Sequence, residues 1–189
     1  MNRLHRWYCR SSRWKTTLET EILPWSLGAI ELGDHVLEIG PGPGLTTDWL
    51  RHRCRSLTCL EVDQNLAVSL ERRKAALGVR VQCGSATAMP YGDCTFSDVV
   101  SFTMLHHVPS VALQDRLFHE VRRVLKPGGA FVGVDSLGSW WMKVFHLRDT
   151  LVLVDPVKLP DRLQAIGFGD VSIETRNSRF RFVAHRPSR

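Results

Sequence analysis

Acidic residues and glycines in the first third of the chain have a spacing that suits the binding of a nucleotide. Residues 35–50 read HVLEIGPGPGLTTDWL, an apolar run that contains Glu38 and passes into a turn with Gly40, Gly42 and Gly44. Glycine adopts positive φ and lets a ligand approach the backbone, and a helix that begins after such a turn presents free N–H groups. A second carboxylate, Glu61, ends another apolar run, where it can accept hydrogen bonds from ribose hydroxyls. These residues predict a cradle for a nucleotide-like cofactor.

Two adjacent histidines could supply acid–base chemistry. His106 and His107 follow the apolar run FSDVVSF at 96–102. In an open α/β sheet, ligands bind beyond the carboxyl ends of the strands, and a histidine there can accept a proton near neutral pH. We expect one of the pair to be catalytic. The alternative is that the histidines only pack and hydrogen-bond the backbone.

The elements that must position these residues alternate between apolar β-prone runs and amphipathic segments. Strands are predicted at 35–39, 56–62, 79–83, 96–102 and 130–135, and helices at 45–53, 64–76 and 111–126. The sequence Pro127-Gly128-Gly129 is expected to end the last of these helices. This alternation predicts parallel βαβ units in a doubly wound sheet. After residue 156 the pattern changes to one helix and two close strands, which predicts an antiparallel hairpin with RNS near its turn.

Four segments in order carry a resemblance to a known family: VLEIGPGPG, LEVD, GSATAMPYGDCTFSDVVSFTMLHHV and VRRVLKPGG. Together they resemble the successive motifs of the class I S-adenosylmethionine-dependent methyltransferases. The nearest group is the small-molecule type 11 set, which includes the ubiquinone/menaquinone biosynthesis methyltransferases. The resemblance covers residues 33–135. It implies an α/β fold with a Rossmann-like, doubly wound, seven-stranded sheet, mostly parallel with an antiparallel last strand, in a three-layer αβα sandwich.

The resemblance also implies a cofactor, S-adenosyl-L-methionine, and roles for individual residues. Glu38 would face the methionine ammonium, directly or through water, and the glycines would let the backbone pass under the methionine and ribose. Glu61 would bind the ribose hydroxyls, and Val62 and Ala86 would contact the adenine. Ser85 stands where the family often has Asp, and Phe102 would line the methionine end. The implied cofactor-binding set is Glu38, Gly40, Gly42, Gly44, Glu61, Val62, Ser85, Ala86 and Phe102.

Composition and charge limit the alternatives. The net charge of +6 comes largely from the ends of the chain, since five Lys or Arg precede Glu19 and five arginines follow Glu174. Such ends could bind nucleic acid, but solvated basic termini on an enzyme explain them as well. The five cysteines form no C-x-x-C pair, so we expect free thiols, no metal site and a cytoplasmic location, with a mitochondrial leader as the weaker alternative. No apolar run is long enough for a stable membrane insertion.

The predicted organisation is a single domain over 1–189. Within it we expect an N-terminal helical cap (1–32), a cofactor-binding core (33–135), an insertion or lid (136–155) and a closing helix with a hairpin (156–189). The predicted function is methyl transfer to a small, apolar acceptor, enclosed by tryptophans of the cap and the insertion. RNA-directed methyl transfer, a non-catalytic cofactor-binding role and a nicotinamide-dependent enzyme are the alternatives. SFTM at 101–104 lacks the Asn/Asp-Pro-Pro-aromatic motif of methyltransferases that act on amide or base nitrogens.

Overall fold

A seven-stranded sheet forms the centre of the computed structural model, which describes residues 11–28, 30–74, 77–138 and 150–188. The strand order is β3-β2-β1-β4-β5-β7-β6. All neighbouring strands pair in parallel except β7, which is antiparallel to both β5 and β6. The strands are β1 (His35–Ile39), β2 (Ser56–Glu61), β3 (Val79–Cys83), β4 (Phe96–Phe102), β5 (Leu125–Ser136), β6 (Gly169–Arg176) and β7 (Arg179–His185).

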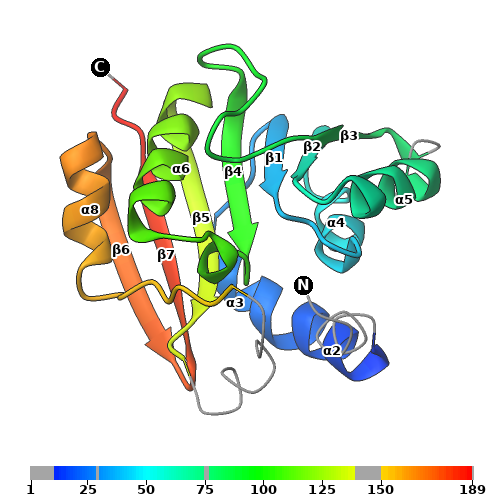
Figure 1. Cartoon of the computed structure of the whole chain (residues 1–189), viewed down its shortest axis with the longest axis horizontal. Helices are drawn as coiled ribbons and strands as arrows, with labels where there is room; N and C mark the ends of the chain where they lie inside the picture. The colour runs from blue at the N-terminus through cyan, green and yellow to red at the C-terminus, as the bar shows by residue number, and fades with distance from the viewer. Residues whose placement is uncertain (1–10, 29, 75–76, 139–149, 189) are drawn as a thin grey trace.

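Helices cover both faces of the sheet, as expected for three layers. On one face, α6 (Val111–Val124) and α8 (Leu159–Ile166) pack on Leu37, Val99 and Phe131 of the central strands. On the other face lie five further elements: α2 (Ser12–Thr17), the π-helical turn η1 (Leu18–Ile22) and α3 (Leu23–Leu27), which follow one another directly, together with α4 (Leu45–Leu50) and α5 (Gln64–Lys74). Figure 1 shows α6 and α8 in front of the sheet, with α2 and α3 at the end toward which the β4 arrowhead points.

Alternating side chains of the central strands supply the two cores. Phe131 of β5 belongs to the α6–α8 side, whereas its neighbours Ala130 and Val132 belong to the other side, and all three are buried. A strand that is covered on both faces must be apolar at consecutive positions, and this explains the continuous apolar runs in the sequence. The doubly wound, seven-stranded α/β fold with its antiparallel last strand is therefore confirmed.

Two predicted boundaries near residue 125 are wrong. The helix predicted over 111–126 ends at Val124, and the strand predicted over 130–135 already begins at Leu125. Leu125 is fully buried and pairs with Phe96 of β4, and the pairing then shifts before it resumes at Asp98 and Ala130. The Lys-Pro-Gly-Gly sequence thus forms an irregular start of β5 rather than a loop after the helix.

The other boundaries agree with the sequence to within a few residues. The strands 35–39, 79–83 and 96–102 have the predicted limits, while the helix predicted over 45–53 is shorter and has Arg51 as its C-cap. The predicted hairpin is present, with Asn177 at positive φ in its turn. Most of the predicted insertion, residues 139–149, lies outside the described residues.

This topology brings the candidate residues to one edge of the sheet. β1 pairs with β2 on one side and with β4 on the other, so the connections after β1 and β4 leave in different directions. A crevice forms at such a point, outside the carboxyl ends of the strands. Among the described residues, no helix has both the length and the apolarity required to span a membrane.

Candidate active site

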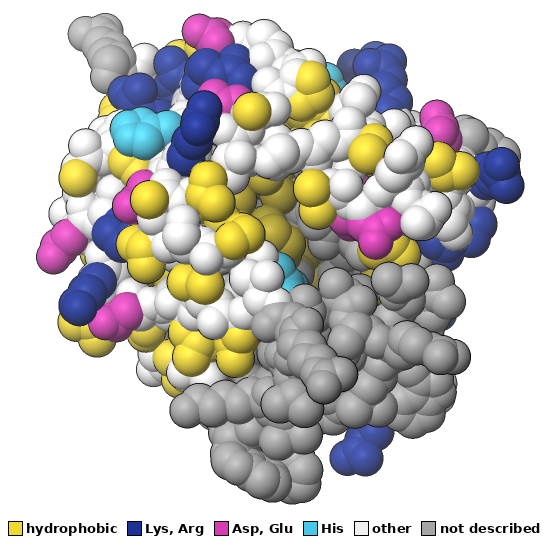
Figure 2. All heavy atoms as spheres, viewed as in Figure 1, with side chains coloured by type: hydrophobic (Ala, Val, Ile, Leu, Met, Phe, Trp, Pro, Cys, Tyr) yellow, Lys and Arg dark blue, Asp and Glu magenta, His cyan; other side chains and the backbone are white. Residues whose placement is uncertain are grey.

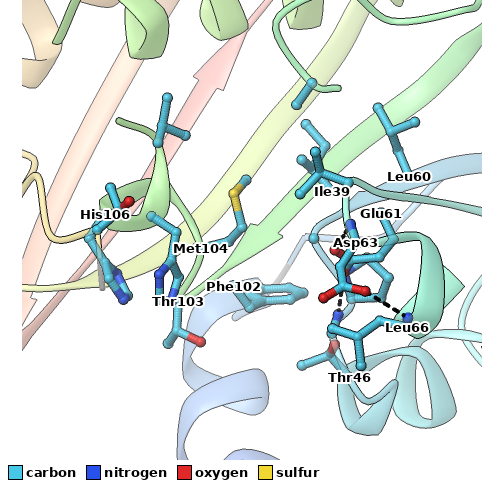
Figure 3. A pocket seen from close by; sticks show the side chains of 18 of the residues that line it. Ile39, Thr46, Leu60, Glu61, Asp63, Leu66, Phe102, Thr103, Met104 and His106 are labelled. Carbon is cyan, nitrogen blue, oxygen red and sulfur yellow. Dashed lines mark hydrogen bonds between the residues drawn. The ribbon is translucent and has the colours of Figure 1, made fainter. Parts of the chain in front are cut away.

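A cavity of about 600 Å³ lies at the carboxyl edge of the sheet. Its walls come from the segments that follow β1, β2, β3 and β4, with contributions from α2, η1 and the β6–β7 turn. Figure 2 shows hydrophobic side chains and a histidine around a hollow in the middle of this view of the molecule. In Figure 3, Glu61 and Asp63 lie toward one end of the cavity and His106 toward the other, with Phe102 and Met104 between them.

The three glycines of the turn all have positive φ angles, but they differ in what surrounds them. Gly40 (φ 65°) and Gly42 (φ 53°) line the cavity, and a Cβ added to Gly42 would meet nothing within 4 Å. Gly44 (φ 83°) does not line the cavity, because it begins α4 and faces the side chain of Leu70. Gly42 therefore leaves room for a ligand, whereas Gly40 leaves room for the side chain of Met104 and Gly44 for the packing of α5.

Glu61 joins two of the loops that form the cradle. Its carboxylate is only 5% exposed, and it accepts hydrogen bonds from the backbone N–H of Gly42 (3.0 Å) and of Asp63 (3.0 Å). Asp63 in turn caps α5 by accepting from the N–H of Asn65 (2.9 Å) and Leu66 (3.1 Å). The Glu61 carboxylate thus stands in the cavity wall in a fixed orientation, as a group that binds ribose hydroxyls must.

Glu38 lies behind the cavity wall rather than in it. It is 1% exposed, and its oxygens accept hydrogen bonds from the hydroxyls of Thr46 and Thr47 (2.6 Å to Thr47) and from the thiol of Cys59 (3.4 Å). Burial raises the pKa of this carboxyl, and the two threonine hydroxyls oppose that shift. Thr46, unlike Glu38, lines the cavity. The expected role of Glu38 toward the methionine ammonium, directly or through water, stays a prediction, and Thr46 is the group of this cluster that lines the cavity.

The segments after β2 and β3 form the opposite wall. Val62 is 73% exposed although it is apolar, and it lines the cavity together with Ser85 and Ala86. The Ser85 hydroxyl accepts from the backbone N–H of Thr87 (3.2 Å) and lies 2.9 Å from its hydroxyl. It therefore stabilises its own turn, and an exposed apolar surface at Val62 is ready to pack against a flat ring.

His106 forms a buried pair with Asp135 at the other end of the cavity. The His106 Nδ1 lies 2.5 Å from Asp135 Oδ1, and the His106 backbone N–H donates to Asp135 Oδ2 (3.1 Å). Asp135 is fully buried and His106 is 3% exposed, yet His106 lines the cavity. A carboxylate that accepts from Nδ1–H leaves Nε2 as the proton-accepting nitrogen of the ring. Both histidines lie on the 3₁₀ turn η3 (Leu105–His107), with their ring centroids 4.3 Å apart.

Asp135 is a candidate functional residue that sequence reasoning missed. A signal for it existed, because an acid at the end of the predicted strand 130–135 must reach the same sheet edge as His106. The predicted residues Gly40, Gly42, Glu61, Val62, Ser85, Ala86, Phe102, His106 and His107 all line this cavity, whereas Glu38 and Gly44 do not.

The far wall comes from segments outside the core motifs. Trp14 and Leu18 contribute from the N-terminal helices, and Ser136, Gly138 and Thr150 flank the undescribed part of the insertion. Ser178 and Arg179 contribute from the β6–β7 turn. The predicted involvement of Trp140 and Trp141 concerns residues outside the described ones.

The donor set fits S-adenosylmethionine. Gly42 leaves open space for a ligand beside the glycine turn. The Glu61 carboxylate can accept hydrogen bonds from hydroxyl groups, and the exposed Val62 side chain provides an apolar surface. No cluster of three or more His, Cys, Asp or Glu side chains suited to a metal ion occurs in the part of the chain that the structure describes.

Comparisons with known proteins agree with this geometry. A family model described as a methyltransferase domain matches residues 37–133. The ubiquinone/menaquinone biosynthesis C-methyltransferase UbiE of Rubrivivax gelatinosus is 25% identical over 121 residues, which cover 64% of this chain and 47% of that protein. The demethylmenaquinone methyltransferase of Thermobifida fusca is 32% identical over 125 residues, 59% of this chain and 52% of that protein. The chain thus spans about half the length of these curated relatives.

Two solved structures share the fold over nearly the whole chain. The PH0226 protein from Pyrococcus horikoshii superposes with a TM-score of 0.78 at 15% identity, covering 95% of this chain and 94% of that one. The Haemonchus contortus phosphoethanolamine N-methyltransferase 2, in complex with S-adenosyl-L-methionine, gives 0.76 at 14% identity, covering 99% of this chain and 60% of that one. The family match spans the strands that build the cradle, from β1 into β5. This chain therefore belongs to the class I S-adenosylmethionine-dependent methyltransferases of the type 11 methyltransferase-domain family.

Proposed function

We propose that this chain transfers a methyl group from S-adenosylmethionine to a small, largely apolar acceptor, with His106 as the proton acceptor. The observation that carries the proposal is the continuity of the cavity, which joins the glycine cradle and Glu61 to the buried His106–Asp135 pair. A cofactor end and an acid–base end in one cavity suit a transfer that depends on the alignment of the two reacting groups.

The cradle residues have separate proposed tasks. Glu61 binds the ribose hydroxyls, Val62 packs on the adenine, and the backbone at Ala86 meets the edge of the adenine ring. Gly40, Gly42 and Phe102 border the methionine end. Glu38 acts through Thr46 as a positioning residue, because it holds the threonine that lines the cavity. When bound, the cofactor supplies an activated methyl group on a positively charged sulfur.

His106 and Asp135 serve the acceptor. The acceptor atom would donate an electron pair to the methyl carbon while the bond from that carbon to the cofactor sulfur breaks and its electron pair stays on sulfur, and any proton on the acceptor atom would pass to His106 Nε2. Asp135 fixes the ring through Nδ1 and stabilises the imidazolium that forms. The Asp135 carboxylate accepts from the His106 backbone N–H and from the His106 ring, and these two contacts support a fixed orientation of the ring.

The acceptor side of the cavity is proposed to lie between the N-terminal cap and the insertion. Trp14 and Leu18 of the cap line the cavity, and so do Ser136, Gly138 and Thr150 of the insertion. Their positions support an acceptor side between these two segments. The surfaces of Trp14, Leu18 and Val108 favour an apolar acceptor body. The cytoplasmic location expected from the cysteine pattern stays a prediction.

Calorimetry tests the cofactor assignment. We expect S-adenosylhomocysteine to bind and NAD not to bind, and Glu61→Gln to weaken the affinity about ten-fold or more, since a charge-assisted hydrogen bond contributes roughly 1.5–3 kcal/mol. Glu71→Gln is the matched control, because Glu71 is exposed on α5 and does not line the cavity. Thermal unfolding of both variants verifies their folding. Binding of NAD alone would contradict the proposal.

Methyl transfer from labelled S-adenosylmethionine to a metabolite extract tests the reaction. We expect label in the organic phase and a loss of about 10²–10⁴ in rate for His106→Asn, with unchanged affinity for S-adenosylhomocysteine. Asp135→Asn should shift the pH dependence of the rate as well as lower it. Label in RNA would support the nucleic-acid alternative, and label in no fraction would support the non-catalytic one.

A further inference from the structure

Three arginines of the β6–β7 hairpin have different surroundings although they lie close together. They are Arg176, Arg179 and Arg181. Arg176 pairs in register with Arg179 next to the turn, and Arg181 is two residues further along β7. Because side chains alternate along a strand, Arg179 and Arg181 share one face of β7, and the buried Phe180 lies on the other.

Arg181 has its charge balanced within the fold. Its guanidinium lies 2.8 Å from Glu174 and donates to the carbonyl oxygen of Trp25 (2.8 Å). The Trp25 indole N–H donates to the same Glu174 carboxylate (2.8 Å). These contacts fasten the hairpin to α3, so Arg181 has a structural role.

Arg179 has no such partner among the described residues. Its guanidinium stands over the ring of Trp14, with 5.8 Å between the guanidinium carbon and the ring centroid. It is half-buried and lines the same cavity as His106, together with the neighbouring Ser178 and the β5 residue Ser136. A half-buried cation beside hydroxyls, with no carboxylate bound to it in the described structure, is poised to bind an anion from the cavity.

The carboxylates that line the cavity are committed to other groups. Glu61 accepts from backbone N–H groups, and Asp63 caps α5, so both belong to the cofactor end of the cradle. Asp135 is paired with His106. Among the described residues, the positive charge of Arg179 at the acceptor side is therefore not neutralised by the carboxylates that line the cavity.

We propose that Arg179 binds an anionic group of the methyl acceptor, a carboxylate or a phosphate, and so orients the acceptor in the cavity. This inference rests on the proposed function. The planar guanidinium can hold either anion with two parallel hydrogen bonds, and its contact with Trp14 restricts its orientation before the acceptor arrives. The acceptor class is thus amphiphilic: an apolar body along Trp14 and Leu18, and one anionic head at the hairpin.

The test uses short amphiphiles as probes and the full chain saturated with S-adenosylhomocysteine. Calorimetry compares decanoate and decyl phosphate with the uncharged decanamide. We expect at least one of the two anions to bind ten-fold or more tightly than decanamide. Arg179→Gln should remove that difference and leave the binding of decanamide and of S-adenosylhomocysteine unchanged. The two anions separate a carboxylate from a phosphate acceptor.

Arg176→Gln is the matched control, because Arg176 is exposed on the same hairpin and does not line the cavity. We expect this variant to bind the anions as the unchanged chain does. Equal binding of decanamide and both anions, no binding of any probe, or equal losses in the two variants would overturn the proposal. Failure of the unchanged chain to bind S-adenosylhomocysteine would instead overturn the proposed function, so the two failures are distinguishable.

Discussion

Glu38 shows how a single acid can be fully buried beside a ligand cavity. Thr46 and Thr47 on α4 and Cys59 on β2 donate to its two oxygens, so the group links β1 to α4 and to β2. Burial nevertheless raises the pKa of Glu38, which means that the folded chain holds a proton there more tightly than the unfolded chain does. This has a consequence for the pH dependence of stability.

We expect Glu38→Gln to remove a pH-dependent contribution to the free energy of unfolding. The contribution of Glu38 is most favourable below the ordinary value of 4.5 and decreases as the pH rises from there through the raised folded-state pKa. Relative to Glu38→Gln, the unchanged chain should lose stability over that window, by at most about 1.4 kcal/mol per pH unit. Urea unfolding of both proteins at a series of pH values measures the difference. A difference that grows more favourable with rising pH would contradict the raised pKa.

Gly42 and Gly44 should respond differently to the same substitution. Both have positive φ, which costs an alanine roughly 1–2 kcal/mol, but only at Gly44 would the new methyl group collide with Leu70. We expect Gly44→Ala to lower the free energy of unfolding by clearly more than Gly42→Ala. Gly42→Ala should mainly weaken the binding of S-adenosylhomocysteine, because its methyl group enters the cavity. Denaturation and calorimetry on the two variants separate these effects, and equal stability losses would refute the distinction.

At the scale of elements, the turn that carries His106 is fastened from several directions. The backbone oxygen of His106 accepts from the N–H of Val152 (2.8 Å), just beyond the undescribed part of the insertion. Gln114 of α6 is fully buried, and its side-chain amide donates to the carbonyl oxygens of Leu105 (3.3 Å) and Val152 (2.8 Å). Its oxygen accepts from Arg162 of α8 (3.2 Å). Both helices of this face therefore hold η3 in place.

Gln114→Leu should destabilise the chain through this network. The substitution keeps a similar volume but removes one hydrogen bond from each of two carbonyl oxygens and the bonds of Arg162 to the Gln114 oxygen, although Arg162 keeps its contact with Asp115, so we expect a cost of about 1–3 kcal/mol. Gln164→Leu on the exposed side of α8 is the control and should change stability by less than about 0.5 kcal/mol. Chemical denaturation measures both. If the two variants proved equally stable, the network would not contribute to holding η3.

Elements with continuous apolar runs could be predicted from the sequence, and those decided by tertiary contacts could not. The limits of β1, β3 and β4 follow from apolar residues bounded by turn formers. The end of α6 does not, because Leu125 suits either a helix or a strand, and only its pairing with Phe96 settles the choice. The π-helical turn at Leu18–Ile22 has no local signature of its own in the sequence.

The candidate site likewise contains residues that could be predicted from the sequence and residues that could not. The glycines and Glu61 could be predicted because their spacing along one βαβ unit brings them together. The pairing of Asp135 with His106 and the place of Arg179 depend on which strands are neighbours, and β7 enters between β5 and β6. The displacement of Glu38 from the cavity depends on the threonine hydroxyls that bury it. Non-local contacts of this kind leave no periodicity to detect.

At the scale of the whole molecule, three of the four described arginines that follow Glu174 face the interior of the fold or the cavity. Arg181 is paired with Glu174, and Arg186 donates to the carbonyl oxygens of Arg122 (2.8 Å), Arg123 (3.2 Å) and Leu125 (2.6 Å) at the end of α6. Arg179 lines the cavity. Arg181 and Arg186 satisfy internal groups and Arg179 faces the cavity, which leaves Arg176 as the exposed arginine of the described part of this end. These side chains therefore form no row along one surface, and this weakens the nucleic-acid alternative.

The whole molecule should also report the binding of its cofactor, because the cavity joins segments that follow four of its strands. A ligand that contacts all of them binds only the folded chain and stabilises it by about 2.7 kcal/mol at a concentration of 100 times its dissociation constant. For a chain of 189 residues this corresponds to a rise of roughly 5–10 °C in the melting temperature.

Differential scanning fluorimetry with S-adenosylmethionine, S-adenosylhomocysteine and NAD tests this expectation. The first two should raise the melting temperature in a concentration-dependent way, and NAD should leave it unchanged, because the turn has Leu45 where a dinucleotide-binding turn has its third glycine. In Arg179→Gln the rise should be preserved, since Arg179 is assigned to the acceptor and not to the cofactor. A rise with NAD equal to that with S-adenosylhomocysteine would contradict the cofactor assignment. A smaller rise in Arg179→Gln would instead move Arg179 from the acceptor side of the cavity to the cofactor side.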